Sequence, residues 1–332
     1  MKETCRAENM EKLSIYITTY NRIEYLKIAV RSVFDQTSTD FKLYILDNCS
    51  TDGTEDYVLS INDPKVHYIK HPYNIGGIEN INYAFEHCDS DYFCVFHDDD
   101  IFHSALLETE VLYMDQHVEC AAVSCLSNYI DESGRIIKSN SDIDNDAVKE
   151  YSNTDFFENY INKQHNLIFP ATMYRNQFVK EHRIRLKKST GPCADVVLYM
   201  DIEKAGGVIA EIQKPLYSYR VYAEQDSSIN FEKMLMQLIK YLNQDTYYST
   251  LLNNNKKGKE RYYRWYIRKL LIRVASQKIN HRIAKQYFEE MRKELDGAFF
   301  YYYIVKMILC LEDIFPIPFK CAYRWAKERP DR

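Results

Sequence analysis

Four consecutive residues, His97, Asp98, Asp99 and Asp100, gather metal-binding side chains at the end of an apolar segment. Neighbouring carboxylates repel one another, and their burial costs desolvation energy unless a cation offsets it. Mg²⁺ and Mn²⁺ prefer oxygen ligands, and Mg²⁺ usually keeps phosphate and water oxygens beside one or two protein carboxylates. The cluster therefore predicts a site for a divalent metal and a nucleotide diphosphate, in preference to a solvated acidic turn.

Strand and helix patterns alternate on both sides of this cluster. Segments rich in β-forming residues lie at 13–20, 41–47, 66–70 and 91–96, and helical patterns lie at 24–36, 76–87 and 104–114. This alternation predicts an α/β fold with a doubly wound, mostly parallel sheet. Ligands of such sheets bind beyond the carboxyl ends of the strands, near the switch in strand order.

Further polar residues fall at the predicted strand ends. Thr18, Tyr20 and Asn21 end the first strand, and Asp47 and Asn48 end the second. They could line a nucleotide pocket, with Asp47 or Asn48 bonded to a base or ribose and Tyr20 stacked on it. An ordinary turn and a helix cap explain the same residues equally well at this stage.

Three residues outside these strand ends are weaker candidates. Gly76 opens a helix and would let a phosphate approach backbone N–H groups, although a plain loop is the simpler interpretation. Asp195 begins a predicted helix at 194–205 and by itself is best explained as an N-cap or first-turn acid. Arg220 could pair with phosphate or lie on a solvated strand face. Strands are also expected at 121–130, 167–174 and 207–212, a loop at 139–155 and helices from 231 onward.

Taken together, four segments resemble the family-2 inverting glycosyltransferases with the GT-A fold. They are SIYITTYNR at 14–22, LDNCSTDG at 46–53, NIGGIEN at 74–80 and FHDDD at 96–100. Their order and spacing match over roughly residues 12–225. The resemblance implies a GT-A-like, doubly wound mixed sheet whose Rossmann-like half binds a nucleotide, followed by a helical C-terminal extension. It divides the chain into a catalytic domain at 12–230 and a basic, aromatic-rich helical region at 231–332.

The resemblance also implies a role for individual residues. The nucleotide and its diphosphate would be bound by a set of residues from the strand ends and the late loop: Thr18, Tyr20, Asn21, Asp47, Asn48, Gly76, Asn80, His97, Asp98 and Arg220. Mn²⁺ or Mg²⁺ would be held by Asp99 and Asp100. Asp195 would be the catalytic base, taking the proton from an acceptor hydroxyl while the metal and Arg220 stabilise the leaving diphosphate.

Two positions depart from the family pattern. His97 replaces the usual first Asp of the D-x-D motif, and Tyr222 stands where the late R-x-H pattern has a histidine. These departures favour one rival hypothesis, a catalytically impaired carbohydrate-binding or scaffold protein on the same fold. A metal-dependent phosphatase or nucleotidyltransferase built on the carboxylates is the other. The leading prediction is transfer from a UDP-sugar to a glycan or lipid-linked acceptor in surface polysaccharide synthesis.

Charge is distributed unevenly along the chain. The net charge is -5, but residues 256–332 carry 19 Lys and Arg against 9 Asp and Glu, which leaves 24 against 39 for residues 1–255. The basic part interleaves with aromatic residues, which suits a helical appendage, a peripheral membrane surface attracting anionic lipid, or a homo-oligomer contact. We expect no nucleic-acid partner, because no RNA- or DNA-binding motif accompanies the basic residues.

The remaining features suggest where the protein works. The N-terminus lacks the apolar core of a signal peptide, and no segment reaches about 18 uninterrupted apolar residues. The nine cysteines include no C-x-x-C pair, so a structural zinc site is not expected. Together these features predict a cytoplasmic protein, placed at the inner face of the cell membrane if the basic region binds lipid.

Overall fold

The computed structural model describes residues 12–38, 40–140, 147–163, 165–222 and 231–275, with residues 282, 286–287 and 289 in addition. The described residues divide into two compact units. Unit 1 draws on Met1–Phe156, Asn166–Lys188 and Ala194–Gln225, and unit 2 on Phe157–His165, Ser189–Cys193 and Asp226–Arg332. Every residue of the predicted nucleotide and metal site belongs to unit 1.

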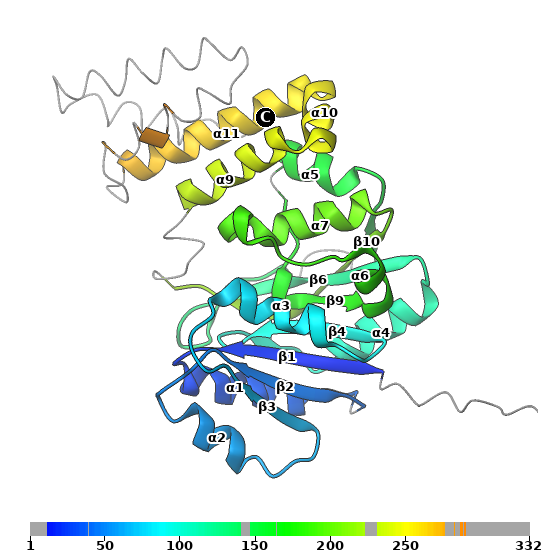
Figure 1. Ribbon diagram of the computed structural model, residues 1–332, viewed down its shortest axis with the longest axis vertical. Helices are drawn as coiled ribbons and strands as arrows, with labels where there is room; N and C mark the ends of the chain where they lie inside the picture. Colours follow the sequence, from blue (N-terminus) through cyan, green and yellow to red (C-terminus); the bar gives the residue numbers. More distant parts are fainter. Residues whose placement is uncertain are drawn as a thin grey trace, which may run out of the picture. The chain divides into compact units, whose positions relative to one another are not determined.

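The first half of unit 1 forms the parallel part of a sheet. Its strands are β1 (Leu13–Thr19), β2 (Lys42–Asp47), β3 (Val66–Lys70) and β4 (Tyr92–His97), in the spatial order β3-β2-β1-β4. The connecting helices are α1 (Ile23–Phe34), α2 (Thr54–Ser60) and α3 (Gly77–His87). The strand order reverses between β1 and β4, so α3 lies on the opposite face of the sheet from α1 (Figure 1).

The register of these strands aligns their carboxyl ends. Thr18 pairs with His97 across β1 and β4, and Thr19 pairs with Asp47 across β1 and β2. Upstream of these pairs β1 and β4 are buried and almost wholly apolar, as at Ile15, and β2 is buried at Leu43, Ile45 and Leu46. The apolar interior therefore fixes the register, and the register brings the polar residues to one edge at the switch point.

The second half of unit 1 makes the sheet mixed. Next to β4, β9 (Thr172–Arg175) runs antiparallel, followed by β6 (Cys120–Ile130), β10 (Val208–Arg220) and β5 (Ile101–Phe102). β7 (Ile136–Lys138) pairs with β6, and β8 (Val148–Tyr151) pairs with β10. The helices of this half are α4 (Leu106–Gln116), α6 (Asn176–His182) and α7 (Ala194–Lys204), with the 3-10 turn η1 (Phe169–Ala171). A second 3-10 turn, η2 (Lys188–Cys193), belongs to unit 2 except for its first residue. The predicted α/β class with a doubly wound mixed sheet is confirmed.

Two local predictions were wrong. The expected loop at 139–155 contains β8 and the start of α5 (Asp155–Lys163). Three of the four residues of β8 are exposed, so its sequence lacks the alternation that marks a half-buried strand. The strand expected at 167–174 begins only at Thr172, because Pro170 lies in the preceding 3-10 turn and has no N–H to donate to a ladder.

Unit 2 is helical, as expected from residue 231 onward. Its helices are α9 (Phe231–Gln244), α10 (Thr246–Asn254) and α11 (Lys256–Ala275). Asp245 caps α10 by accepting hydrogen bonds from the backbone N–H groups of Tyr247 and Tyr248. Most of the basic region beyond residue 275 lies outside the described residues. In the part of the chain that the structure describes, no helix is long and apolar enough to cross a membrane.

Candidate active site

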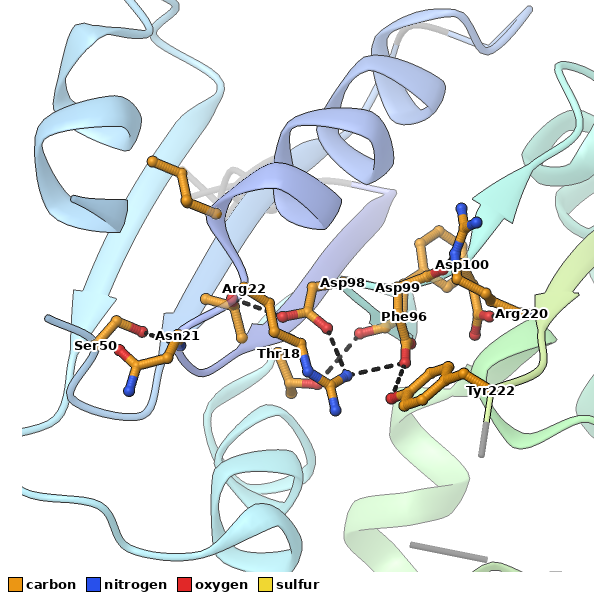
Figure 2. Close-up of polar contacts among 12 residues, drawn as sticks. Thr18, Asn21, Arg22, Ser50, Phe96, Asp98, Asp99, Asp100, Arg220 and Tyr222 are labelled. Carbon is orange, nitrogen blue, oxygen red and sulfur yellow. Dashed lines mark hydrogen bonds and ion pairs between the residues drawn. The ribbon is translucent and has the colours of Figure 1, made fainter. Parts of the chain in front are cut away.

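The turn between β4 and β5 carries the acidic cluster and is anchored at Asp100 (Figure 2). Asp100 is 1% exposed, and its Oδ2 accepts a hydrogen bond from the Tyr217 hydroxyl at 2.7 Å. Its Oδ1 accepts from the backbone N–H of Arg220 at 2.8 Å. Burial and the neighbouring Asp99 raise the pKa of Asp100, so these two donors compensate an unfavourable charge. β10, which carries Tyr217 and Arg220, thus holds the acidic turn in place.

Arg220 has a structural position that the sequence did not indicate. Its side chain is 1% exposed, and its Nε donates to the backbone carbonyl of Asp99 at 2.6 Å. Its Nη1 donates to the carbonyls of Asp131 and Glu132, both at 2.8 Å. The guanidinium therefore binds the backbone of two turns, whereas the sequence placed it against the diphosphate.

Asp98 and Asp99 form the part of the cluster that faces Arg22. Thr19 donates to Asp98 Oδ2 at 2.7 Å, and the Arg22 guanidinium lies 3.4 Å from Asp98 Oδ1 and 2.9 Å from Asp99 Oδ2. The Tyr222 hydroxyl also donates to Asp99 Oδ2, at 2.7 Å. Burial, with a further contribution from Asp99, raises the pKa of Asp98 to about 7. Burial and the neighbouring carboxylate of Asp99 thus disfavour the charged form of Asp98.

Three side chains of the cluster have the chemistry of a metal site. His97, Asp99 and Asp100 each offer a ligand atom, and these atoms lie within 4.8 Å of one another. Burial lowers the pKa of His97, which favours the neutral imidazole that a metal requires. One nitrogen and two carboxylates suit Mn²⁺, and two carboxylates with added phosphate and water suit Mg²⁺. The predicted pair of Asp99 and Asp100 is therefore joined by His97, while Asp98 turns toward Thr19 and Arg22.

The end of β2 forms a second polar corner, which is closed. Asp47 is 0% exposed, and its two oxygens accept from the backbone N–H of Ser50 and from the Tyr68 hydroxyl. Asn80 is also buried, donates to the carbonyl of Leu46 at 3.1 Å and bonds to His71 through its Oδ1. Both residues were predicted to contact the nucleotide, and both are engaged in holding the loops around the end of β2.

Asn48 and Gly76 belong to the same corner and shape its rim. Asn48 donates to Asn74 at 2.9 Å and accepts from the backbone N–H of Ile75 at 2.8 Å. Gly76 adopts φ of 88°, which favours glycine, and a Cβ placed there would meet nothing within 4 Å. Gly76 is exposed, but its N–H already donates to Asn74 Oδ1 at 2.9 Å, and Asn48 holds the same loop at the start of α3.

The residues at the end of β1 and directly after it are more exposed than Asp47 and Asn80. Tyr20 is 45% exposed, and Thr18 is half-buried with its hydroxyl donating to the carbonyl of Phe96 at 3.4 Å. Asn21 has φ of 53° and accepts from the backbone N–H of Thr51 at 2.8 Å. Its own backbone N–H donates to the Ser50 hydroxyl at 2.9 Å, which also ties this turn to the loop after β2 (Figure 2). Tyr20 thus offers an exposed aromatic ring directly after β1.

Asp195 lies in the first turn of α7. Its Oδ1 accepts from the backbone N–H of Val196 at 2.8 Å, and its Oδ2 accepts from Asn166 Nδ2 at 2.9 Å. Burial raises the pKa of Asp195, although both hydrogen bonds act in the opposite direction. A half-buried carboxylate with a raised pKa is a stronger base than an ordinary aspartate. The helix start orients this carboxylate, and Asn166 holds its second oxygen.

Comparison with known proteins identifies the family of the chain. The family model described as Glycosyl transferase family 2 matches residues 14–183, which is just over half of the chain. The chain belongs to this family. An uncharacterized glycosyltransferase of Haemophilus influenzae is 24% identical over 239 residues, covering 67% of this chain and 69% of that protein. The putative colanic acid biosynthesis glycosyl transferase WcaA of Escherichia coli is 33% identical over 95 residues, covering 28% of this chain and 34% of WcaA.

Solved structures show that the fold is that of GT-A transferases. S. aureus TarS 1-349 in complex with UDP-GlcNAc matches with a TM-score of 0.64 at 15% identity, covering 96% of this chain and 90% of that chain. A mannosyltransferase from Pyrobaculum calidifontis in complex with GDP-Man and Mn2+ matches with a TM-score of 0.55 at 11% identity, covering 96% and 85%. The predicted family and fold are both confirmed.

Sequence reasoning missed some residues at the site of this family 2 transferase, among them Arg22 and Asn166. Arg22 contacts the acidic cluster and Asn166 contacts Asp195, although 76 and 29 positions separate each pair in sequence. Arg22 ends the first matching segment, so its place directly after the predicted strand end was a usable signal. Asn166 lies in an irregular segment, and nothing in its sequence surroundings indicated that it would meet Asp195.

Proposed function

We propose that this family 2 transferase is an inverting, metal-dependent enzyme that moves a sugar from a UDP-sugar to a hydroxyl of an acceptor. The observation that carries the proposal is the convergence of His97, Asp99 and Asp100 at the switch point of the sheet. A divalent cation there would be held by these three residues and would offset the charge that grows on the departing diphosphate. The exposed ring of Tyr20 and the exposed loop at Gly76 are available to the rest of the nucleotide.

Asp195 is the group that we assign to the proton transfer. As the acceptor oxygen attacks the anomeric carbon, Asp195 takes its proton, and the bond between that carbon and the phosphate oxygen breaks. The nucleoside diphosphate leaves with the bonding electrons, and a single displacement inverts the configuration. The raised pKa of Asp195 and its fixed orientation on Val196 and Asn166 both support this role.

The acceptor and location belong to the same proposal. Relatives such as WcaA are named for the synthesis of surface polysaccharide, which supports a glycan or lipid-linked acceptor at the inner face of the cell membrane. We propose that residues 12–230 form the catalytic domain and that the basic region at 231–332 brings the enzyme to the membrane. The surplus of positive charge after residue 256 supports that attraction.

A panel of UDP- and GDP-sugars tests the proposal, with Mn²⁺, Mg²⁺ or EDTA present. Transfer and release of nucleoside diphosphate are measured for the full chain, for Asp99→Asn and for Asp195→Asn. Both variants should lose transfer, whereas UDP affinity should weaken mainly in Asp99→Asn. Asp56→Asn, an exposed aspartate on α2, is the matched control and should behave as the parent.

The two rival functions give different results in the same assay. A phosphatase or nucleotidyltransferase would turn over the nucleotide without sugar transfer, and a scaffold protein would bind sugar or nucleotide without turnover. Full transfer in EDTA would exclude the metal requirement. Full transfer by Asp195→Asn would exclude Asp195 as the base.

A further inference from the structure

Asp99 Oδ2, an oxygen of the acidic cluster, already accepts as many hydrogen bonds as it can. Asp99 Oδ2 accepts from Arg22 Nη1 at 2.9 Å and from the Tyr222 hydroxyl at 2.7 Å (Figure 2). A carboxylate oxygen offers two lone pairs, so these two donors occupy both. A metal ion that coordinates Asp99 through Oδ2 must therefore displace at least one of them.

Arg22 and Arg220 both lie at this turn, but they are held very differently. Arg220 is 1% exposed and its guanidinium donates to three backbone carbonyls. The side chain of Arg22 is 41% exposed, and its guanidinium contacts the two carboxylates and lies 5.6 Å from the centre of the Tyr222 ring. Arg22 is thus the arginine that can move without unfolding a turn.

We propose that Arg22 binds the diphosphate of the sugar donor, and that Arg22 and Tyr222 release Asp99 when the divalent ion binds. This inference rests on the proposed function of the same site. Before metal binds, the guanidinium supplies the positive charge that the carboxylates require. Once a dication supplies that charge, repulsion between the two cations favours turning the guanidinium outward. A planar guanidinium is well suited to two oxygens of a diphosphate bound on the same metal.

Tyr222 explains one of the two departures from the family pattern. Where the pattern has histidine, this chain has a hydroxyl that donates to Asp99 and an aromatic ring beside Arg22. Tyr222 would therefore hold the metal-free arrangement together without carrying charge of its own. Tyr222→Phe removes this hydroxyl without changing the net charge. It therefore tests only whether the hydroxyl competes with the metal ion for Asp99.

Binding of Mn²⁺ alone, measured by calorimetry on the full chain, tests the release step. Tyr222→Phe should bind Mn²⁺ about two- to tenfold more tightly than the parent, because a neutral hydrogen bond no longer competes for Asp99. Arg22→Met should also bind Mn²⁺ more tightly. Arg31→Met is the matched control, since Arg31 lies on α1, the helix that begins directly after Arg22, with its side chain 85% exposed. It should leave Mn²⁺ affinity unchanged.

Binding of UDP and of GDP at saturating Mn²⁺ tests the diphosphate contact. Arg22→Met should weaken the nucleotide that the parent binds by about tenfold or more, because a charge-assisted hydrogen bond is lost. Arg22→Lys should show a smaller loss, and Tyr222→Phe and Arg31→Met should show none. Thermal unfolding of each variant shows that the fold is kept.

The outcomes separate this inference from the function on which it rests. If the parent binds neither nucleotide with Mn²⁺, the proposed function fails and the inference fails with it. If the parent binds and transfers but Arg22→Met keeps its nucleotide affinity, the function stands and the role of Arg22 is wrong. If Mn²⁺ affinity is unchanged in Tyr222→Phe, the ion does not compete for Asp99 Oδ2 and the release step is wrong.

Discussion

The ends of β2 and β4 place aspartates at the same edge of one sheet, but in opposite states. At the end of β2, Asp47 is fully buried and each of its oxygens accepts a hydrogen bond from a neighbouring loop or strand. At the end of β4, Asp98 and Asp99 lie side by side and share the guanidinium of Arg22. The first corner is complete within the protein, whereas the second is crowded with like charge.

This difference indicates which corner meets a ligand. A buried carboxylate whose hydrogen bonds are satisfied stabilises the fold and has little capacity for a new partner. Carboxyls such as Asp98 and Asp100, whose pKa is raised by burial and by the charge of Asp99, are held at a cost in stability, and such sites are typical of function. The acidic turn should therefore respond to substitution through activity, and the corner at β2 through stability.

The largest effect is expected at Asp99. Asp99→Asn should lower the transfer rate by about 10³-fold or more, because a ligand and a charge at the diphosphate are lost. The midpoint of thermal unfolding should stay the same or rise, since Asp99 contributes to the raised pKa of both Asp98 and Asp100. A variant that unfolds several degrees earlier would show that the acidic turn is structural like the corner at β2.

At the end of β2, substitution of Asp47 should affect stability more than activity. Asp47→Ala should lower the free energy of unfolding by about 2–4 kcal/mol, because a buried backbone N–H and the Tyr68 hydroxyl lose their acceptor. Urea unfolding measures the loss, with the exposed Asp56→Ala as control. Unchanged stability together with a large rise in the dissociation constant for UDP would restore Asp47 as a direct contact to the nucleotide.

Glu110 supplies a third case, a buried carboxyl without compensation and away from the sheet edge. It is 0% exposed on α4, and neither carboxyl oxygen has a hydrogen-bond partner among the described residues. Burial raises its pKa well above the ordinary value. Unfolded chains ionise this group above about pH 4.5 while the folded protein keeps it protonated, so its contribution to stability falls as pH rises.

Replacing Glu110 by Met should therefore stabilise the protein, and more so at high pH. We expect a gain of about 1–3 kcal/mol at pH 8 and a smaller gain at pH 5, measured by urea unfolding at both values. Glu108→Met, at an exposed position of the same helix, should show no such pH dependence. An equal gain at the two pH values would mean that Glu110 ionises in the folded protein.

The two corners show which features of the site could be predicted from the sequence and which could not. Strand ends, the switch point and the acidic cluster followed from periodicity, because buried strands require apolar residues and their ends do not. The division of roles did not follow, since it depends on partners distant in sequence. Asp47 is closed by Tyr68, Asp100 by Tyr217, and Arg220 reaches carbonyls about 90 positions away. Such pairings exist only once the sheet order is formed.

Asn166 offers the smallest and most specific effect, because it acts on one carboxylate. It donates to Asp195 Oδ2, and its own Oδ1 is buried without a partner in the described part of the chain. A hydrogen bond to the charged form lowers the pKa of a carboxyl, so Asn166→Ala should raise the pKa of Asp195. If Asp195 is the base, kcat/KM falls below this pKa, and the acidic limb of the pH profile should move upward by up to about one unit.

The size of the shift decides whether Asn166 positions Asp195 or only packs beside it. At a pH well above the limb, Asn166→Ala should recover most of the parent rate, because Asp195 is then ionised in both proteins. Asn162→Ala, a half-buried amide four residues earlier that donates to the carbonyl of Glu158, should leave the profile in place. A uniform loss of rate at every pH would point to displacement of α7. If the acidic limb does not move and the rate is unchanged, Asn166 has no role in the proton transfer.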